Sequence, residues 1–192
     1  MRVSIHQPNF LPWYPFFEKM RSVDVFVLLG HCQFEKGKFQ NRFRLHDQWH
    51  TMSVNHGLEP IVDKRYTSFQ KDWSGIKSRL PQLSHVLCAF DEDIQESLHD
   101  TNVAIIRKIA RLLEISTQIE MDSPTTTRAT DRLVELCLKH GATTYVAGTS
   151  GGHYMELEKF ERAGIKVETQ DLSSLDRRHT LEILAGMTVN CT

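Results

Sequence analysis

The fold class follows from residues 118–169, which read QIEMDSPTTTRATDRLVELCLKHGATTYVAGTSGGHYMELEKFERAGIKVET. Short apolar runs alternate in it with longer segments whose apolar residues recur at helical spacing. These patterns predict strands at 118–121, 143–147 and 166–169, and helices at 128–140 and 152–163. Because strands that alternate with helices pair in parallel, we predict an α/β fold with a doubly wound, mostly parallel, Rossmann-like sheet.

The N-terminal part of the chain adds two strands and an insertion. We expect strands at 2–6 and 24–29 around an aromatic-rich helix at 10–21. Residues 39–54 alternate polar and apolar side chains around the turn-forming pair His46 and Asp47, which predicts an inserted β-hairpin. Helical spacing then predicts a helical middle segment with helices at 69–80 and 93–113. From Asp171 onward the signals are weak, and we expect this tail either to wrap over the sheet or to be mobile.

Composition limits the class of protein. At 192 residues with 40% hydrophobic content, the chain predicts a single α/β domain over residues 1–192. Lys and Arg total 23 against 24 Asp and Glu, so we expect neither nucleic acid nor membrane as a partner. No apolar stretch approaches the roughly 20 residues that a bilayer requires, and no signal peptide is recognisable, so a cytoplasmic location is expected. The sequence does not determine the oligomeric state.

The cysteines argue against a metal centre. Cys32, Cys88, Cys137 and Cys191 are widely separated and form no CxxC pair. We therefore expect no metal site, and reduced thiols in the cytosol.

A first polar cluster follows the first predicted strand. His6, Gln7 and Asn9 lie there between rigid prolines, with Trp13 as a wall. In a parallel sheet, ligands collect beyond the carboxyl ends of the strands, so these side chains are candidates for a binding site. The alternative is structural: His6 would cap the end of the strand, and Asn9 would cap the helix.

A second cluster, GHCQFEKGKFQNRFR at residues 30–44, follows the second strand. Gln33, Lys36, Asn41 and Arg42 supply amide and cationic groups that suit phosphate, carboxylate or sugar hydroxyls. The alternative is a solvated hairpin whose basic residues face water, and this interpretation is favoured for Lys38 and Arg44.

A third stretch, YVAGTSGGHYM at residues 145–155, places glycines between a strand and a helix. Glycines allow a backbone to approach an anion at a helix start, although a plain glycine turn has the same pattern. The candidate residues are Gly148, Ser150, Gly151, Gly152 and Tyr154. We expect all three stretches to converge on one pocket.

Together, the three stretches resemble the WbqC-like protein family of bacterial surface-polysaccharide gene clusters. HQPNFLPWYPFF at residues 6–17 is similar to the family's opening pattern, and GHCQFEKGKFQNR and YVAGTSGGHYM are similar to its two later patterns. The resemblance covers roughly residues 3 to 170. There are two departures: Gly30 and His31 stand where the family commonly has an acidic pair, and Glu182 is the candidate for a late acidic position.

The resemblance implies an enzyme that modifies a nucleotide-linked amino sugar in lipopolysaccharide (O-antigen) biosynthesis. The reaction expected is acyl or aminoacyl transfer to the sugar amine, with an activated acyl donor or ATP as the second reactant left open. His6 would be the catalytic base, because an imidazole titrates near neutral pH. The substrate-binding residues would be Gln7, Asn9, Trp13, Gln33, Lys36, Asn41, Arg42, Gly148, Ser150, Gly151, Gly152 and Tyr154.

Two other functions remain open from the sequence. The strand, the His-containing turn and the helix at the start also resemble the opening of HUP-type nucleotidyltransferases, but the HxGH signature of that class is missing. A non-catalytic sugar-nucleotide-binding protein is the third possibility, in which Trp13, Phe34 and Tyr154 would only stack on the ligand.

Overall fold

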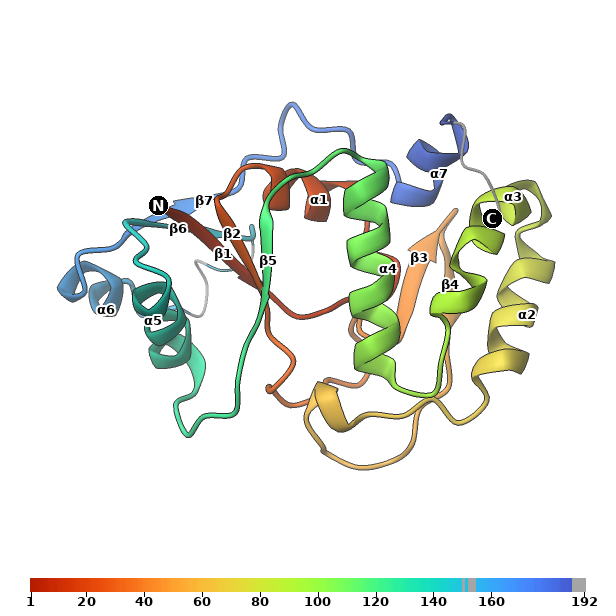
Figure 1. Cartoon of the computed structure of the whole chain (residues 1–192), viewed down its shortest axis with the longest axis horizontal. Coiled ribbons are helices and arrows are strands. Elements are labelled where there is room, and N and C mark those ends of the chain that lie inside the picture. The colour runs from red at the N-terminus through yellow and green to blue at the C-terminus, as the bar shows by residue number, and fades with distance from the viewer. Residues whose placement is uncertain (150, 152–154, 188–192) are drawn as a thin grey trace.

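The chain forms a five-stranded parallel sheet and a separate two-stranded hairpin (Figure 1). The computed structural model describes residues 1–149, 151 and 155–187. The parallel strands are β1 (Arg2–His6), β2 (Val25–Leu28), β5 (Gln118–Met121), β6 (Thr144–Ala147) and β7 (Lys166–Thr169). The hairpin consists of β3 (Arg42–Leu45) and β4 (Gln48–Thr51). The predicted α/β class, with a mostly parallel sheet and an inserted hairpin, is confirmed.

Helices cover both faces of the parallel sheet. These are α1 (Tyr14–Arg21) and α4 (Leu98–Leu112) on one face, and α5 (Ala129–Lys139) and α6 (Leu157–Arg162) on the other. The helices α2 (Phe69–Arg79), α3 (Ser84–Leu87) and α7 (Thr180–Ala185) lie on the side of the hairpin (Figure 1). Short 3-10 turns occur at Ile61–Asp63, Pro81–Leu83 and Cys88–Asp93. None of the helices in the described part of the chain is long and apolar enough to span a bilayer.

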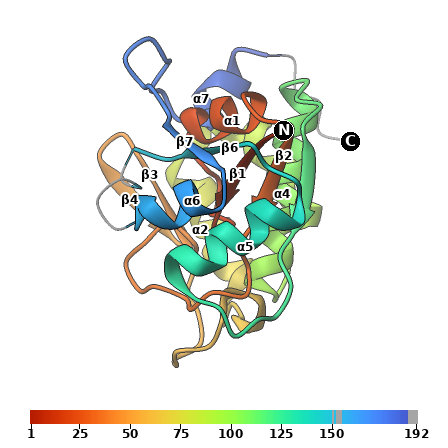
Figure 2. The ribbon, with the colours of Figure 1, turned by 90° about the vertical axis from the view of Figure 1, so that its left-hand side faces the viewer.

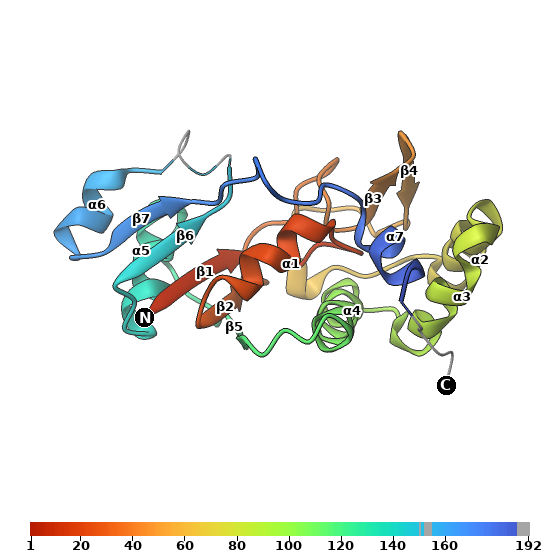
Figure 3. The same cartoon turned by 90° about the horizontal axis from the view of Figure 1, so that it is seen from above.

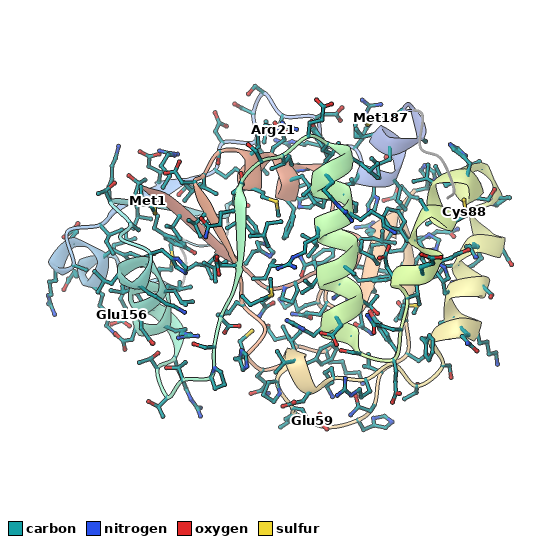
Figure 4. The ribbon with its side chains drawn as sticks, viewed as in Figure 1. Met1, Arg21, Glu59, Cys88, Glu156 and Met187 are labelled. Atoms are coloured by element: carbon teal, nitrogen blue, oxygen red, sulfur yellow. The ribbon has the colours of Figure 1, made fainter. Side chains whose placement is uncertain are left out.

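Two apolar layers hold these elements together. On one face of the sheet, Val3, Val25 and Tyr145 pack against α5 and α6, which lie in front of the sheet in Figure 2. On the other face, Phe26 packs with α1 and α4 in a larger cluster that continues into the hairpin, α2, α3 and α7. Side chains fill the space between the sheet and α4 that the ribbon leaves open (Figure 4).

Three predicted segments differ from the structure. The first helix begins at Tyr14 instead of residue 10, because Leu11 has a left-handed φ of 43° that a helix does not accept. The helix predicted from residue 93 begins at Leu98, where the Ser97 hydroxyl accepts the N–H of Asp100. The helix predicted at 152–163 begins at Leu157, and residues 152–154 lie outside the described residues.

The tail after Asp171 packs mainly beside the hairpin and α3. It forms α7, whose Leu181 and Leu184 are buried in the larger apolar cluster. His179 and Glu182 cap this helix reciprocally, so Glu182 has a structural role at its start. Cys32 and Cys137 are free, whereas Cys88 is disulfide-bonded, which differs from the reduced state expected for it.

The strand order β5-β2-β1-β6-β7 places a topological switch point between β1 and β6. β1 pairs with β2 along its length, up to His6 opposite Leu28. Its register with β6 ends at Val3 opposite Tyr145; one residue further, the Ser4 hydroxyl donates to the Val146 carbonyl at 2.8 Å, so the backbone ladder stops short of the carboxyl ends of these two strands. The strands run toward the half of the molecule that holds the hairpin, as Figure 3 shows. A crevice between strands is expected at such a point.

Candidate functional site

His6 ends β1 with its ring hydrogen-bonded on one side. Its Nδ1 lies 2.9 Å from the carbonyl oxygen of Gln7. Because a carbonyl oxygen only accepts, Nδ1 carries the proton and Nε2 presents a lone pair. The ring also meets Phe16 edge-on, with centroids 4.9 Å apart.

Burial lowers the pKa of His6 to about 3, and the positive charge of Lys19 contributes. The imidazole is therefore neutral over the physiological range. This differs from the expectation of a group that titrates near neutral pH. His6 can still accept a hydrogen bond from a ligand, but its strength as a base is limited.

Lys19 is a site residue that the sequence analysis missed. It lies on α1, is only 2% exposed, and its Nζ stands over the Phe26 ring, 5.6 Å from the centroid. A Cβ atom built on Gly148 would lie 3.8 Å from the same Nζ. The signal was available, because Lys19 follows buried Phe16 by three residues and so shares its helix face.

Gln7 joins the first stretch to the second. Its Nε2 donates to Sγ of Cys32 at 3.3 Å and to the Glu35 carboxylate at 3.2 Å. Its Oε1 accepts Nε2 of fully buried Gln40 at 2.6 Å. The structure therefore brings these two stretches into contact, and Gln7 already has partners on both ends of its amide.

Asn102 on α4 holds the contact between the first and second stretches. The sequence analysis did not identify it. Its Nδ2 donates to the carbonyl oxygens of Pro8 at 2.8 Å and Gln40 at 2.7 Å. Its Oδ1 accepts the Tyr66 hydroxyl at 3.3 Å. No local pattern marks Asn102, because its partners come from distant parts of the chain.

The other candidates of the first stretch differ in exposure. Asn9 is partly buried and does not cap α1, whose N-cap is Trp13. The structural alternative for Asn9 is therefore wrong. Trp13 is 44% exposed at the start of α1, so its ring faces solvent beside the carboxyl edge of the sheet.

Within the second stretch, two of the predicted binding residues donate hydrogen bonds to nearby backbone carbonyl oxygens and so stabilise the loop and the hairpin. Asn41 is buried and donates to the Met52 carbonyl at 2.7 Å. The Arg42 guanidinium donates to the carbonyl oxygens of Gly37 and Lys38 and lies 3.8 Å from the centre of the Trp49 ring. Gln33 and Lys36 are exposed.

The third stretch is only partly within the described residues. Gly148 is partly buried beside Lys19. Gly151 is buried, and a Cβ there would lie 3.0 Å from the Ala147 side chain, so a larger residue would have to displace its neighbours slightly. Ser150, Gly152 and Tyr154 lie outside the described residues. Convergence of all three stretches on one pocket therefore stays a prediction.

Asp122, directly after β5, binds Gly30 and His31, the two residues that stand where the family commonly has an acidic pair. Its carboxylate accepts the backbone N–H of Gly30 at 2.8 Å and Nδ1 of His31 at 3.0 Å. Arg132 from α5 pairs with it at 3.3 Å. The side chains of Asp122 and Arg132 are 2% and 7% exposed, so this is a buried ion pair with satisfied partners.

Gly30 has no room for an acidic side chain. A Cβ there would lie 2.8 Å from both the His99 ring and the Val62 side chain. Neighbouring side chains thus occupy the space that a carboxylate at this position would need.

A cavity beside α1 and the possible metal ligands are the remaining features that bear on binding. A cavity of about 380 Å³ lies between α1 and β7, but Arg2 there pairs with Glu168 and Arg21 pairs with Glu18, so these charges already have partners. Among the described residues, no group of three or more His, Cys, Asp or Glu side chains could hold a metal ion.

Sequence comparison with known proteins gives a family for the chain. A model of the WbqC-like protein family matches residues 7–177, which begin directly after β1 and include α1, the hairpin and the parallel strands β2, β5, β6 and β7. An uncharacterized protein of Mycobacterium tuberculosis, Rv1507c, is 27% identical over 185 residues, covering 86% of this chain and 80% of that relative. No solved structure matches the chain significantly. The chain belongs to the WbqC-like protein family.

Proposed function

We propose that the protein is a transferase that modifies a nucleotide-linked amino sugar by moving an acyl or aminoacyl group to the sugar amine. The setting would be surface-polysaccharide biosynthesis. One observation carries the proposal: His6 ends β1 and Gly148 follows β6, the two strands on either side of the switch point of a parallel sheet. Crevices at such points bind nucleotides in open α/β sheets.

The proposed step is a substitution at an acyl carbon. The sugar amine attacks the carbonyl carbon of the activated donor, a C–N bond forms, and the bond from that carbon to its carrier group breaks. The amine proton passes to Nε2 of His6 and then to the departing carrier. An anion bound beside Lys19 would offset the charge that helps to lower the pKa of His6, and so would strengthen this base.

A second function is favoured by two specific observations. The pKa of His6 is about 3, and Gly30 and His31 leave no acidic pair after β2. Both features suit a protein that recognises a sugar nucleotide without transforming it.

Turnover assays separate the two functions. Purified protein is incubated with a panel of nucleotide-linked amino sugars and acyl or aminoacyl donors, with and without ATP, and products are detected by mass. We expect His6→Gln to lower the rate by roughly 10² to 10⁴-fold, since it keeps a hydrogen-bonding side chain but removes the base. The matched control is His56→Gln in an exposed loop, which should keep the wild-type rate.

Each other outcome has a definite meaning. Binding of a sugar nucleotide without turnover across the panel would support the recognition function instead. Full activity in His6→Gln would remove His6 from the chemistry. Absence of any sugar-nucleotide binding would contradict both functions.

A further inference from the structure

Lys19 is a buried cation to which the described residues offer no counter-ion. It is 2% exposed, and in the described ranges no hydrogen bond or ion pair reaches its Nζ; its nearest partner is the face of Phe26. Burial of an unpaired charge costs several kcal/mol, so lysines are almost never buried without a partner. This arrangement needs an explanation beyond folding.

Lys64, the other deeply buried lysine, shows what a structural solution looks like. It is 1% exposed, and its Nζ donates to the carbonyl oxygens of Asn55 and Gly57 and to the Glu59 carboxylate at 2.7 Å. The chain therefore can surround a lysine with acceptors. At Lys19 the described residues place no such acceptors.

The space beside Lys19 is left open by Gly148. A Cβ on this glycine would meet the Lys19 amine at 3.8 Å, and among the described residues, its two chain neighbours aside, no other heavy atom would lie within 4 Å. Gly148 does not have a left-handed φ, so neither its backbone conformation nor its packing against the described residues demands a glycine there. What the missing side chain provides is room next to the amine.

This room lies where a parallel sheet collects anionic ligands. Gly148 directly follows β6, and α1 carries Lys19 back along the neighbouring strand β1, whose end is His6. We propose that Lys19 and the open space at Gly148 form a phosphate site that takes a phosphate group of a nucleoside diphosphate. The inference deepens the proposed function, since it names where the nucleotide part of the substrate binds.

The ionisation of Lys19 supports this assignment. Burial lowers the pKa of its amine to about 7. A bound phosphate would supply the missing negative charge and hold the amine protonated. The Nε2 lone pair of His6, which cannot donate to an anion, is left for an N–H or O–H group elsewhere on the same ligand.

Calorimetric titration with uridine diphosphate and with inorganic pyrophosphate tests the site directly. We expect Lys19→Met to weaken binding roughly 10- to 100-fold, as loss of a charge-assisted hydrogen bond requires. Lys71→Met, at an exposed position of α2, is the control for the lost charge and should bind as the wild type does. Thermal unfolding of Lys19→Met should occur at the same or a higher temperature, because methionine has a similar shape without the buried charge.

A second variant keeps the test decisive if Lys19→Met does not fold. Gly148→Ala places a methyl group at ordinary contact distance from the amine, so the fold should be unchanged while the space for the phosphate shrinks. Unaltered pyrophosphate affinity in either folded variant would overturn the site, and so would failure of the wild type to bind both ligands. Nucleotide binding that depends on Lys19 without turnover would sustain this site and contradict only the acyl transfer.

Discussion

A buried charge lies near the end of β5 and another lies beside the end of β6, and their surroundings are opposite. After β5, the Asp122 carboxylate is surrounded by the Gly30 N–H, the His31 ring and the Arg132 guanidinium. Beside β6, the Lys19 amine has an aromatic face and an open space. A charge that the chain itself neutralises holds the fold together. A charge to which the described residues offer no counter-ion is available to a ligand, as we propose for Lys19.

The topology explains why the two ends differ. The chain enters β5 from α4 and leaves it toward α5, so α5 can place Arg132 over the end of the strand. At the switch point, the connections after β1 and β6 lead to opposite sides of the sheet, and no connection has to cross the gap between them. The end of the β1–β6 ladder at Val3 is the local result.

The largest expected difference is in stability. Asp122→Asn keeps the side-chain shape but removes the buried one of the two carboxylates that pair with Arg132, leaving the exposed Glu135, and it also weakens the hydrogen bonds from Gly30 and His31; we expect the free energy of unfolding to fall by about 2 kcal/mol. Urea denaturation measures it. The control is Asp131→Asn, which removes an exposed ion pair with Lys159 and should cost under about 1 kcal/mol. A loss at Asp122 no larger than at Asp131 would show that the buried pair does not stabilise the fold.

Local patterns predicted much of the fold. The strands at 118–121 and 166–169 were predicted with the bounds that β5 and β7 have, because polar residues alternate with apolar or β-branched ones in QIEM and KVET. His46 and Asp47 were predicted as a turn, and both adopt left-handed φ values of 49° and 61° between β3 and β4. The start of α1 was missed, since helical spacing alone does not reveal a left-handed residue at Leu11.

The candidate site was less predictable because its defining contacts are long-range. Lys19 directly follows charged Glu18, and charged Arg21 comes two residues later. Such a charged segment is typical of an exposed helix face. The helical spacing from Phe16 points instead to the buried face, and the burial of Lys19 in the folded chain decides between the two. Likewise, nothing near Arg42 in the sequence shows that its guanidinium is held by the loop that precedes it.

A smaller effect is expected from the pH dependence of stability. The Lys19 amine has an ordinary pKa of 10.5, which applies to the unfolded chain, and a pKa of about 7 in the folded chain. Between these values the unfolded state binds more protons, so the free energy of unfolding rises with pH from about 7 toward 10. The contribution is expected to be roughly 1 to 2 kcal/mol after structural relaxation.

The difference between wild type and Lys19→Met isolates this contribution. Groups near Lys19 include His6 on β1 and Glu18 and Arg21 on α1, and all of them are retained in the variant. Urea denaturation between pH 6.5 and 9.5 should give a difference that grows with pH in favour of the wild type relative to its value at low pH. A difference that does not change with pH would mean that the amine has an ordinary pKa and is less enclosed than its geometry indicates.

The smallest effect on stability and on phosphate affinity is expected at Arg42. This residue is a useful comparison with Lys19, because it is a cation that the sequence predicted as a phosphate ligand. Its guanidinium donates to two carbonyl oxygens of its own loop and stacks on Trp49, so it has the kind of partners that Lys19 lacks. Arg42→Ala should therefore lower the free energy of unfolding by about 1 kcal/mol or less, through lost stacking and loop hydrogen bonds. Its affinity for pyrophosphate, measured by the same titration, should stay within about threefold of the wild type, since 0.6 kcal/mol is the scale of a weak indirect effect. An affinity loss as large as that of Lys19→Met would instead place the phosphate at the hairpin and leave the open amine beside Gly148 without a function.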